Sequence, residues 1–260
     1  MLQHQRATAT GLLDRDFRAI KAFFIRTTVP LIYEDEGVAG LQGSGCLFET
    51  EGRLFFVTAG HVLEGVDPRK LGVPLRAHGG EVFELGNGVV GCSQMESFDV
   101  AAYRIDDAHT CSALRASYLV LGTSNVAQVV ADSNRFIVVG YPAQTVIKDG
   151  QELRPTDLTQ IHTRQYDGDV VGARGEQDLF LKLRRQGHGL WAQPTVLPDL
   201  RGISGGPVWQ AFESAALVWT PESALRLIGI EVSCDPRCER YIRVLRWEVV
   251  QAALKKLAAS

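Results

Sequence analysis

Short apolar runs recur along most of the chain, with Gly, Pro, Asn or Asp between them. The runs cover residues 45–48, 54–58, 82–85, 100–105, 136–139, 179–183, 207–209 and 227–232. Runs of this length, bounded by turn-forming residues, are typical of β-strands. The pattern therefore predicts an all-β barrel or sandwich rather than alternating βαβ units.

Apolar residues recur at helical spacing only near the two ends of the chain. The first set, within residues 11–26, is Leu13, Phe17, Ile20 and Phe24. The second set, within residues 247–257, is Val250, Ala253, Leu254 and Leu257. We expect the first helix either to pack on the outside of the β structure or to serve as a docking element. We expect the second helix to lie against the second barrel.

The composition is that of an ordinary globular protein. The chain has 260 residues, of which 45% are hydrophobic and 22% charged, so it can bury the core of one large β domain or of two smaller barrels. The net charge is −3 and no long run of Lys or Arg occurs. We expect no binding of nucleic acid, because neutralising phosphates requires a basic surface.

The sequence also bears on location. No apolar stretch approaches the ~20 residues that span a bilayer, so we expect no membrane interaction. Leu12 and Leu13 are followed at once by Asp14, Arg15 and Asp16, which interrupt the apolar region of a signal peptide. These observations predict a cytoplasmic protein.

The chain has five cysteines, an odd number that fits a reduced compartment. Cys234 and Cys238 have the spacing of a small disulfide or of half a metal site. No second Cys/His pair with ligand spacing accompanies them, so we expect thiols rather than a metal site.

A serine among glycines, in the segment GISGGP at residues 202–207, carries the strongest functional signal. The glycines let the backbone turn tightly and bring its amides close to a ligand. Ser204 can then present its hydroxyl outward, while the N–H groups of Gly202 and Ser204 face the oxyanion of a tetrahedral intermediate. Taken alone, the segment is equally compatible with a plain glycine-rich turn.

The same segment also satisfies the G-x-S-x-G pattern of the α/β-hydrolases. That fold requires a catalytic histidine after the serine. The histidines are His4, His61, His78, His109, His162 and His188, and all of them precede Ser204. The α/β-hydrolase interpretation therefore fails.

His61 and Asp99 are the best partners for Ser204. His61 follows an apolar run and a Thr-Ala-Gly turn, which places its ring at the end of a strand. Asp99 directly precedes another apolar run, whereas Asp106 and Asp107 follow that run and have the pattern of solvated turn residues. A carboxylate beside the imidazole would fix its tautomer and support its protonated form.

Three segments together resemble the signature blocks of the trypsin-like (chymotrypsin-fold) serine peptidases. They are TAGHV at residues 58–62, FDVA at residues 98–101 and RGISGGP at residues 201–207. The order His, Asp, Ser is that of this family. The sequence is most similar to bacterial intracellular and HtrA-like members, without a PDZ domain. The resemblance implies two six-stranded antiparallel β-barrels with the active site in the cleft between them.

The resemblance also implies a boundary for each part of the chain. Residues 1–27 would form an N-terminal helical extension, and residues 28–122 the first barrel with His61 and Asp99. Residues 123–245 would form the second barrel with Ser204, and residues 246–260 the C-terminal helix.

By the same resemblance, His61 is the general base, Asp99 the orienting acid and Ser204 the nucleophile, with Gly202 and Ser204 as oxyanion-hole amides. The implied reaction is hydrolysis of peptide bonds in a protein or peptide substrate through an acyl-enzyme, without a metal or cofactor.

Substrate-binding residues follow from the resemblance as well. An extended peptide would add as a strand beside residues 227–233. The residues expected to bind it are Asp199, Arg201, Ile230, Glu231, Val232 and Ser233. Asp199 either attracts an Arg or Lys side chain of the substrate or is a solvated loop residue.

The chain departs from secreted trypsins in two places. Ile203 stands where those enzymes carry an aspartate that pairs with a new N-terminus, so activation by that salt bridge is excluded. Val62 replaces a half-cystine, which would leave Cys46, taken as its partner position, as a free buried thiol. We expect neighbouring loops or an activating partner protein to order the segment around Ser204.

Two other functions remain open. The cleft would capture a peptide without turnover in a non-catalytic binding module, although three intact triad residues argue against this. Alternatively, catalysis would stay dormant until a partner protein binds.

Overall fold

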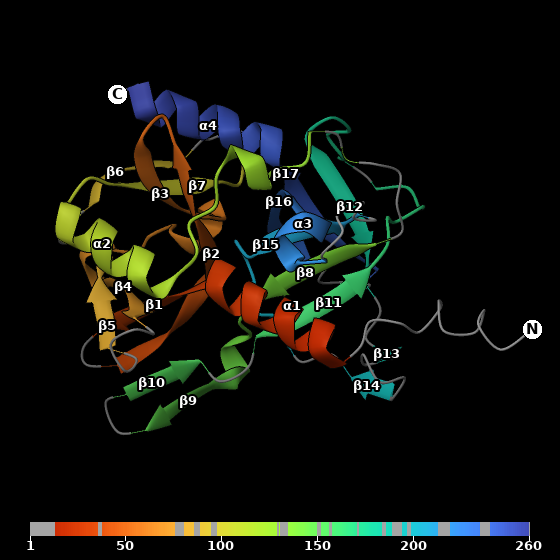
Figure 1. Cartoon of the computed structure of the whole chain (residues 1–260), viewed down its shortest axis with the longest axis horizontal. Coiled ribbons are helices and arrows are strands. Elements are labelled where there is room, and N and C mark those ends of the chain that lie inside the picture. Colours follow the sequence, from red (N-terminus) through yellow and green to blue (C-terminus); the bar gives the residue numbers. More distant parts are fainter. Residues whose placement is uncertain are drawn as a thin grey trace, which may run out of the picture.

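The computed structural model describes residues 14–35, 38–75, 81–85, 89–94, 98–128, 130, 135–149, 152–155, 158–170, 172–183, 186–188, 194–196, 199–212, 219–234 and 240–259. Two antiparallel sheets dominate this part of the chain and lie side by side (Figure 1). The predicted all-β double-barrel class, with a helix near each end, is confirmed.

The first sheet has seven strands in the order β5-β4-β1-β2-β3-β7-β6, one more than the six expected. They are β1 (Val29–Asp35), β2 (Val38–Thr50), β3 (Arg53–Thr58), β4 (Leu71–Leu75), β5 (Glu81–Glu84), β6 (Val89–Gln94) and β7 (Ala101–Ile105). The long strand β2 pairs with β1 through its first half and with β3 from Cys46 onward.

The second sheet has six strands in the order β11-β8-β15-β16-β17-β12. They are β8 (Phe136–Gly140), β11 (Thr159–Thr163), β12 (Asp178–Lys182), β15 (Pro207–Ala211), β16 (Leu225–Cys234) and β17 (Tyr241–Arg246). Two separate hairpins complete the β structure. They are formed by β9 (Val146–Asp149) with β10 (Glu152–Pro155) and by β13 (Gln186–His188) with β14 (Pro194–Val196).

Within the described residues, four α-helices lie against the sheets (Figure 1). They are α1 (Asp14–Thr27), α2 (Ala108–Ser117), α3 (Pro221–Ala224) and α4 (Trp247–Ala259). In α1, Phe23 and Phe24 are buried and their rings lie 5.1 and 5.9 Å from the ring of Trp209 in β15. The helix is therefore packed on the molecule, as the first of the two interpretations predicted; Leu13 lies outside the described residues.

Helix α4 contacts strands of both sheets rather than the second alone, because it lies along β16 and β17 and also touches β2, β6 and β7. Among the described helices, none is both long and apolar enough to cross a membrane.

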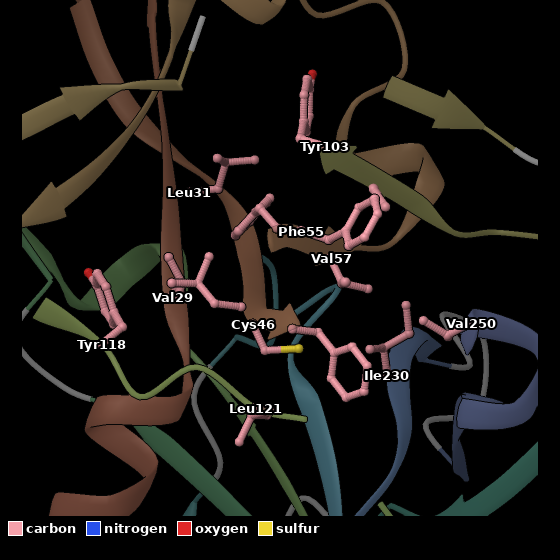
Figure 2. Packing of buried hydrophobic residues seen from close by; sticks show 14 of the residues in the cluster. Val29, Leu31, Cys46, Phe55, Val57, Tyr103, Tyr118, Leu121, Ile230 and Val250 are labelled. Carbon is pink, nitrogen blue, oxygen red and sulfur yellow. The ribbon is translucent and has the colours of Figure 1, made fainter. Parts of the chain in front are cut away.

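One apolar core joins the two sheets. Its members include Val29 and Cys46 from the first sheet, Ile230 from the second and Val250 from α4, and Figure 2 shows their side chains together. A second cluster of buried apolar residues lies inside the barrel that the second sheet forms, and it includes Ile203 and Val208. The shared core holds the two sheets against each other and so fixes the seam at which the Ser204 segment meets the first sheet.

Candidate active site

His61 and Asp99 lie together because β3 and β7 are neighbouring strands. Thr58, the last residue of β3, pairs with Ala101, the first residue of β7. The chain then continues into a short 3-10 turn at Gly60–Val62, and Asp99 lies two residues before β7. Both side chains therefore emerge at the same end of the first sheet.

Asp99 binds His61 through both carboxylate oxygens. Oδ2 lies 2.8 Å from the ring Nδ1, and Oδ1 accepts a hydrogen bond of 2.8 Å from the His61 backbone N–H. Gly60 permits this approach, since a Cβ there would lie only 3.0 Å from Oδ1. The two contacts fix the ring orientation and leave Nε2 as the ring nitrogen for proton transfer.

The pair shifts the pKa of both partners. The hydrogen bond that the His61 ring donates to Asp99 raises the pKa of His61 above its ordinary value of 6.5, against the opposing effect of partial burial. The charges of Asp99, Glu231 and Glu64 also raise it. Burial acts to raise the pKa of Asp99, but the hydrogen bonds from His61 and the charges of His61 and Arg243 outweigh it and lower that pKa. Asp99 is therefore a carboxylate at neutral pH, which is the form that supports an imidazolium.

Ser204 lies in a tight loop, residues 199–206, that precedes β15; we call it the Ser204 loop. Gly202 and Gly205 have φ angles of 95° and 83°, which favour glycine. A Cβ at Gly205 would collide with the Thr58 hydroxyl and the Ser44 carbonyl. The glycines around Ser204 are thus required by the backbone conformation and by close approach to the first sheet.

Between Gly202 and Gly206, two amides of the Ser204 loop are left for a ligand by the described residues. Ile203 N–H donates to the Leu200 carbonyl at 3.1 Å, Gly205 N–H to Glu231 at 2.7 Å and Gly206 N–H to Ile203 at 2.8 Å. By contrast, the N–H groups of Gly202 and Ser204 donate to no acceptor among the residues that the structure describes. These are the two amides predicted to form the oxyanion hole.

The Ser204 loop adjoins the turn that carries His61. A Cβ at Gly43 would lie 2.7 Å from Val62 Cγ1 on one side and 3.2 Å from the Ser204 carbonyl oxygen on the other. Ser204 itself is partly exposed. Within the described chain no hydrogen bond joins the Ser204 hydroxyl to the His61 ring; such contacts are often long without substrate and shorten when it binds.

Ile203 is held by apolar burial instead of a salt bridge. It is 1% exposed and belongs to the cluster inside the second sheet. Gly140 makes room for it, because a Cβ at Gly140 would lie 2.8 Å from Ile203 Cα. An apolar side chain at this position therefore anchors the Ser204 loop by packing.

Ser44 is the residue at this site that the sequence patterns did not indicate. It is fully buried in β2 and makes hydrogen bonds to both Gly202 and Ser204. A small hydroxyl between two glycines is too common in strand–turn sequences to stand out without the contact it makes across the seam.

The substrate-binding candidates fall into two groups. Asp199 and Arg201 form an exposed ion pair at 2.7 Å. The carboxylate of Asp199 is therefore already paired with a cation of its own loop. Ile230, Glu231 and Val232 are buried in β16, and Ser233 is exposed. The two groups lie on either side of Ser204 in the chain.

Among the described strands, none pairs with one edge of β16 beside the Ser204 loop. β15 pairs with β16 only as far as Pro207 and Ile230, and the last bonds run between Glu231 and the glycines at 205 and 206. Beyond Glu231, the described strands pair with β16 only on its other side, through β17.

A hollow of about 560 Å³, lined by Phe98 and residues 174–177, lies next to Asp99.

One expectation from the cysteine pattern is wrong. Gly43, not Cys46, faces Val62, while Cys46, three positions further along β2, pairs with Val57. Cys46 is nevertheless a free buried thiol, and burial raises its pKa to about 12, so it stays protonated and inert. Cys238 and the side chain of Cys234 lie outside the described residues.

Replacing Asp99 with Asn is expected to lower the pKa of His61, because the hydrogen bond and the negative charge that favour the imidazolium are both lost. The measurement is an NMR titration of the His61 ring. Asp67→Asn is the matched control, since Asp67 is paired with Arg69 and does not contact His61. An unchanged or higher His61 pKa in Asp99→Asn would contradict this account of the pair.

No family model and no curated protein matches the sequence. Among solved structures, the active form of the Rv3671c protease from M. tuberculosis matches with 17% identity and a TM-score of 0.54, over 93% of this chain and 85% of that one. The serine endoprotease from Yersinia pestis matches with 15% identity and a TM-score of 0.56, over 94% and 67% of the two chains.

A third protein, the thermostable serine protease AL20 from an extremophilic microorganism, matches with 9% identity and a TM-score of 0.51, over 91% of this chain and 98% of that one. At these identities the likeness concerns the fold and not the substrate. The chain has the trypsin-like double-barrel fold of serine proteases.

Proposed function

We propose that this protein is a serine endopeptidase with His61, Asp99 and Ser204 as its catalytic triad. The observation that carries the proposal is the pairing of His61 with Asp99 beside a loop whose Gly202 and Ser204 amides are left for a ligand. The solved structures with this fold that are named above are serine proteases, which supports the same reaction class.

The proposed mechanism has two similar halves. His61 Nε2 accepts the hydroxyl proton of Ser204 as Oγ attacks the substrate carbonyl carbon, and the carbonyl oxygen becomes an oxyanion that the Gly202 and Ser204 amides stabilise. The intermediate collapses to an acyl-enzyme while the protonated His61 donates its proton to the leaving amine. Water then attacks the ester in the same way, with His61 as base, and Ser204 is released with its proton.

The open edge of β16 is the proposed binding place for the substrate backbone. An extended peptide beside residues 232–234 would continue the sheet at the point where β15 departs from it. The side chains of Ile230 and Val232 belong to the core shared by the two sheets, so these residues would contribute main-chain rather than side-chain contacts.

Glu231 is the proposed source of a preference for a basic side chain. It is 1% exposed, and its backbone is bonded to Gly205 and Gly206, directly beside the nucleophile. Its charge already reaches the site, since it contributes to the raised pKa of His61. Asp199, by comparison, is exposed and paired with Arg201. A Lys or Arg side chain of the substrate would therefore be drawn toward Glu231.

The direct test is cleavage of unfolded casein by the purified chain. Wild type should release peptides, and Ser204→Ala should lose roughly 10⁶-fold in kcat, as expected when a triad nucleophile is removed. Well-folded wild type that cleaves neither casein nor peptide esters, alone or with a co-encoded partner, would contradict the proposal and favour a peptide-binding module. Cleavage only in the presence of the partner would support the proposed triad and would show that the partner activates the enzyme. Activation by such a partner and location in the cytoplasm stay predictions from the sequence.

A peptide library tests the role of Glu231. Wild type should prefer Lys or Arg before the cut, and Glu231→Gln should reduce kcat/KM for those peptides about 10-fold relative to Leu peptides, because the attraction between the buried carboxylate and the substrate's positive charge is lost. Glu64→Gln is the matched control, since Glu64 also raises the His61 pKa but is exposed. Equal preference profiles for Glu231→Gln and wild type would exclude Glu231 as the selector.

A further inference from the structure

Ser44 occupies the seam between the two sheets. It lies in β2, pairs with Pro30 of β1 and has no exposed surface. Its position is two residues before Cys46, where β2 begins to pair with β3. A polar side chain fully buried at such a point is expected to have hydrogen-bond partners.

Ser44 bonds to three separate segments. Its amide donates to the Ser204 carbonyl at 2.8 Å, and its hydroxyl donates to the Gly202 carbonyl at 2.8 Å. The same hydroxyl accepts from the Tyr141 N–H at 2.9 Å, directly after β8. Its carbonyl accepts from the Thr58 hydroxyl at 2.7 Å, three residues before His61.

Four peptide planes flank Gly202 and Ser204, and their carbonyls belong to residues 201–204. The bonds of Ser44 hold two of these four planes. The carbonyl of Arg201 is held by Ala143 N–H at 2.7 Å and that of Ile203 by Gly206 N–H at 2.8 Å. The carbonyls of Gly202 and Ser204 are both held by Ser44. In a peptide plane the C=O of one residue lies opposite the N–H of the next, so the Gly202 and Ser204 N–H groups share their planes with the Arg201 and Ile203 carbonyls. Ser44 holds the plane that follows each of these two amides, and so limits rotation of the backbone at Gly202 and Ser204.

Gly202 is the position at which this control matters most. Its φ of 95° lies in a region that glycine enters and leaves readily, so its neighbouring peptide planes can rotate unless they are held. Ile203 anchors the next residue by apolar packing, but its side chain makes no directional contact with the Gly202 carbonyl. The Ser44 hydroxyl is the side-chain donor to that carbonyl in the described chain.

We propose that Ser44 is a positioning residue that keeps the Ser204 loop in its oxyanion-binding conformation from within the chain. The inference rests on the proposed protease function of the same site. Ser44 takes the place of the salt bridge that Ile203 excludes. It also joins the first sheet, which carries His61, to the loop that carries Ser204. It follows that the isolated chain holds an assembled site without a partner protein.

The test compares Ser44→Ala with wild type in three measurements. A fluorophosphonate probe labels Ser204, and its second-order rate should fall about 10- to 100-fold in Ser44→Ala, less than the roughly 10²- to 10³-fold loss on removing an oxyanion donor outright. For a peptide substrate, kcat should fall while KM changes by less than about threefold, because the lost alignment acts on the transition state. Hydrogen exchange of a peptide covering residues 199–212 should become faster, while exchange in α4 stays the same.

Two variants separate positioning from mere stability. Thr27→Val removes another fully buried hydroxyl, bonded to Phe23 within α1, and should leave the labelling rate unchanged. Ser44→Cys keeps the size and a weak donor, and should give a rate between those of wild type and Ser44→Ala. The melting temperature is recorded for every variant.

Each outcome decides the inference. Labelling of Ser44→Ala within twofold of wild type would overturn it, as would an equal loss in Thr27→Val. If wild type is not labelled at all, the proposed function fails, and the hydrogen-exchange comparison still decides on Ser44: faster exchange at residues 199–212 supports its positioning role, and unchanged exchange overturns it.

Discussion

The backbone hydrogen bond from the Ser44 amide to the Ser204 carbonyl joins the two sheets at the residue where the chemistry is proposed. A site divided between two β-barrels depends on the relative position of its halves, because His61 and Asp99 come from one and Ser204 from the other. The shared core that includes Cys46, Ile230 and α4 sets this relation over a large area. Ser44 sets it locally, where an error of about 1 Å is enough to cost roughly 10²-fold in rate.

From Gly202 to Ser204, the Ser204 loop is held by interactions that do not titrate. Ile203 is buried among apolar side chains, and Ser44 binds through a neutral hydroxyl and its backbone. A loop ordered by a carboxylate and an ammonium group would loosen when either changed its charge. Here the titrating group near neutral pH is His61, whose pKa is raised by Asp99 and by more distant carboxylates. The pH dependence of the site is therefore expected to report the charge of His61 rather than the order of the loop.

The strands and the triad candidates could be predicted because their signals are local. Short apolar runs separated by turn residues identify β structure, and His61, Asp99 and Ser204 each stand in a distinctive segment. Helix α2 was missed because it is short and weakly amphipathic. Its signal was Asp107, whose side chain accepts a hydrogen bond from the Thr110 amide as an N-cap, whereas the sequence pattern had indicated a solvated turn.

What the sequence did not reveal depends on register and on contacts across the seam. Choosing Gly43 rather than Cys46 as the residue opposite Val62 would have required a pairing register that no local pattern contains. Ser44 depends on contacts more than 90 residues away in the chain, with Tyr141 and Gly202. The pairing of Asp199 with Arg201 and the burial of Glu231 likewise follow from the folded arrangement and not from residue type.

The most direct test of the central claim is a crystal structure of the chain phosphonylated at Ser204. The account predicts that the phosphonyl oxygen lies about 2.7–3.1 Å from both the Gly202 and the Ser204 nitrogen atoms, the range expected of oxyanion donors. It also predicts that the Ser44 hydroxyl still bonds to the Gly202 carbonyl. A phosphonyl oxygen directed to solvent, or a Ser204 loop rebuilt without the Ser44 contacts, would contradict the claim that the chain carries a preassembled oxyanion hole.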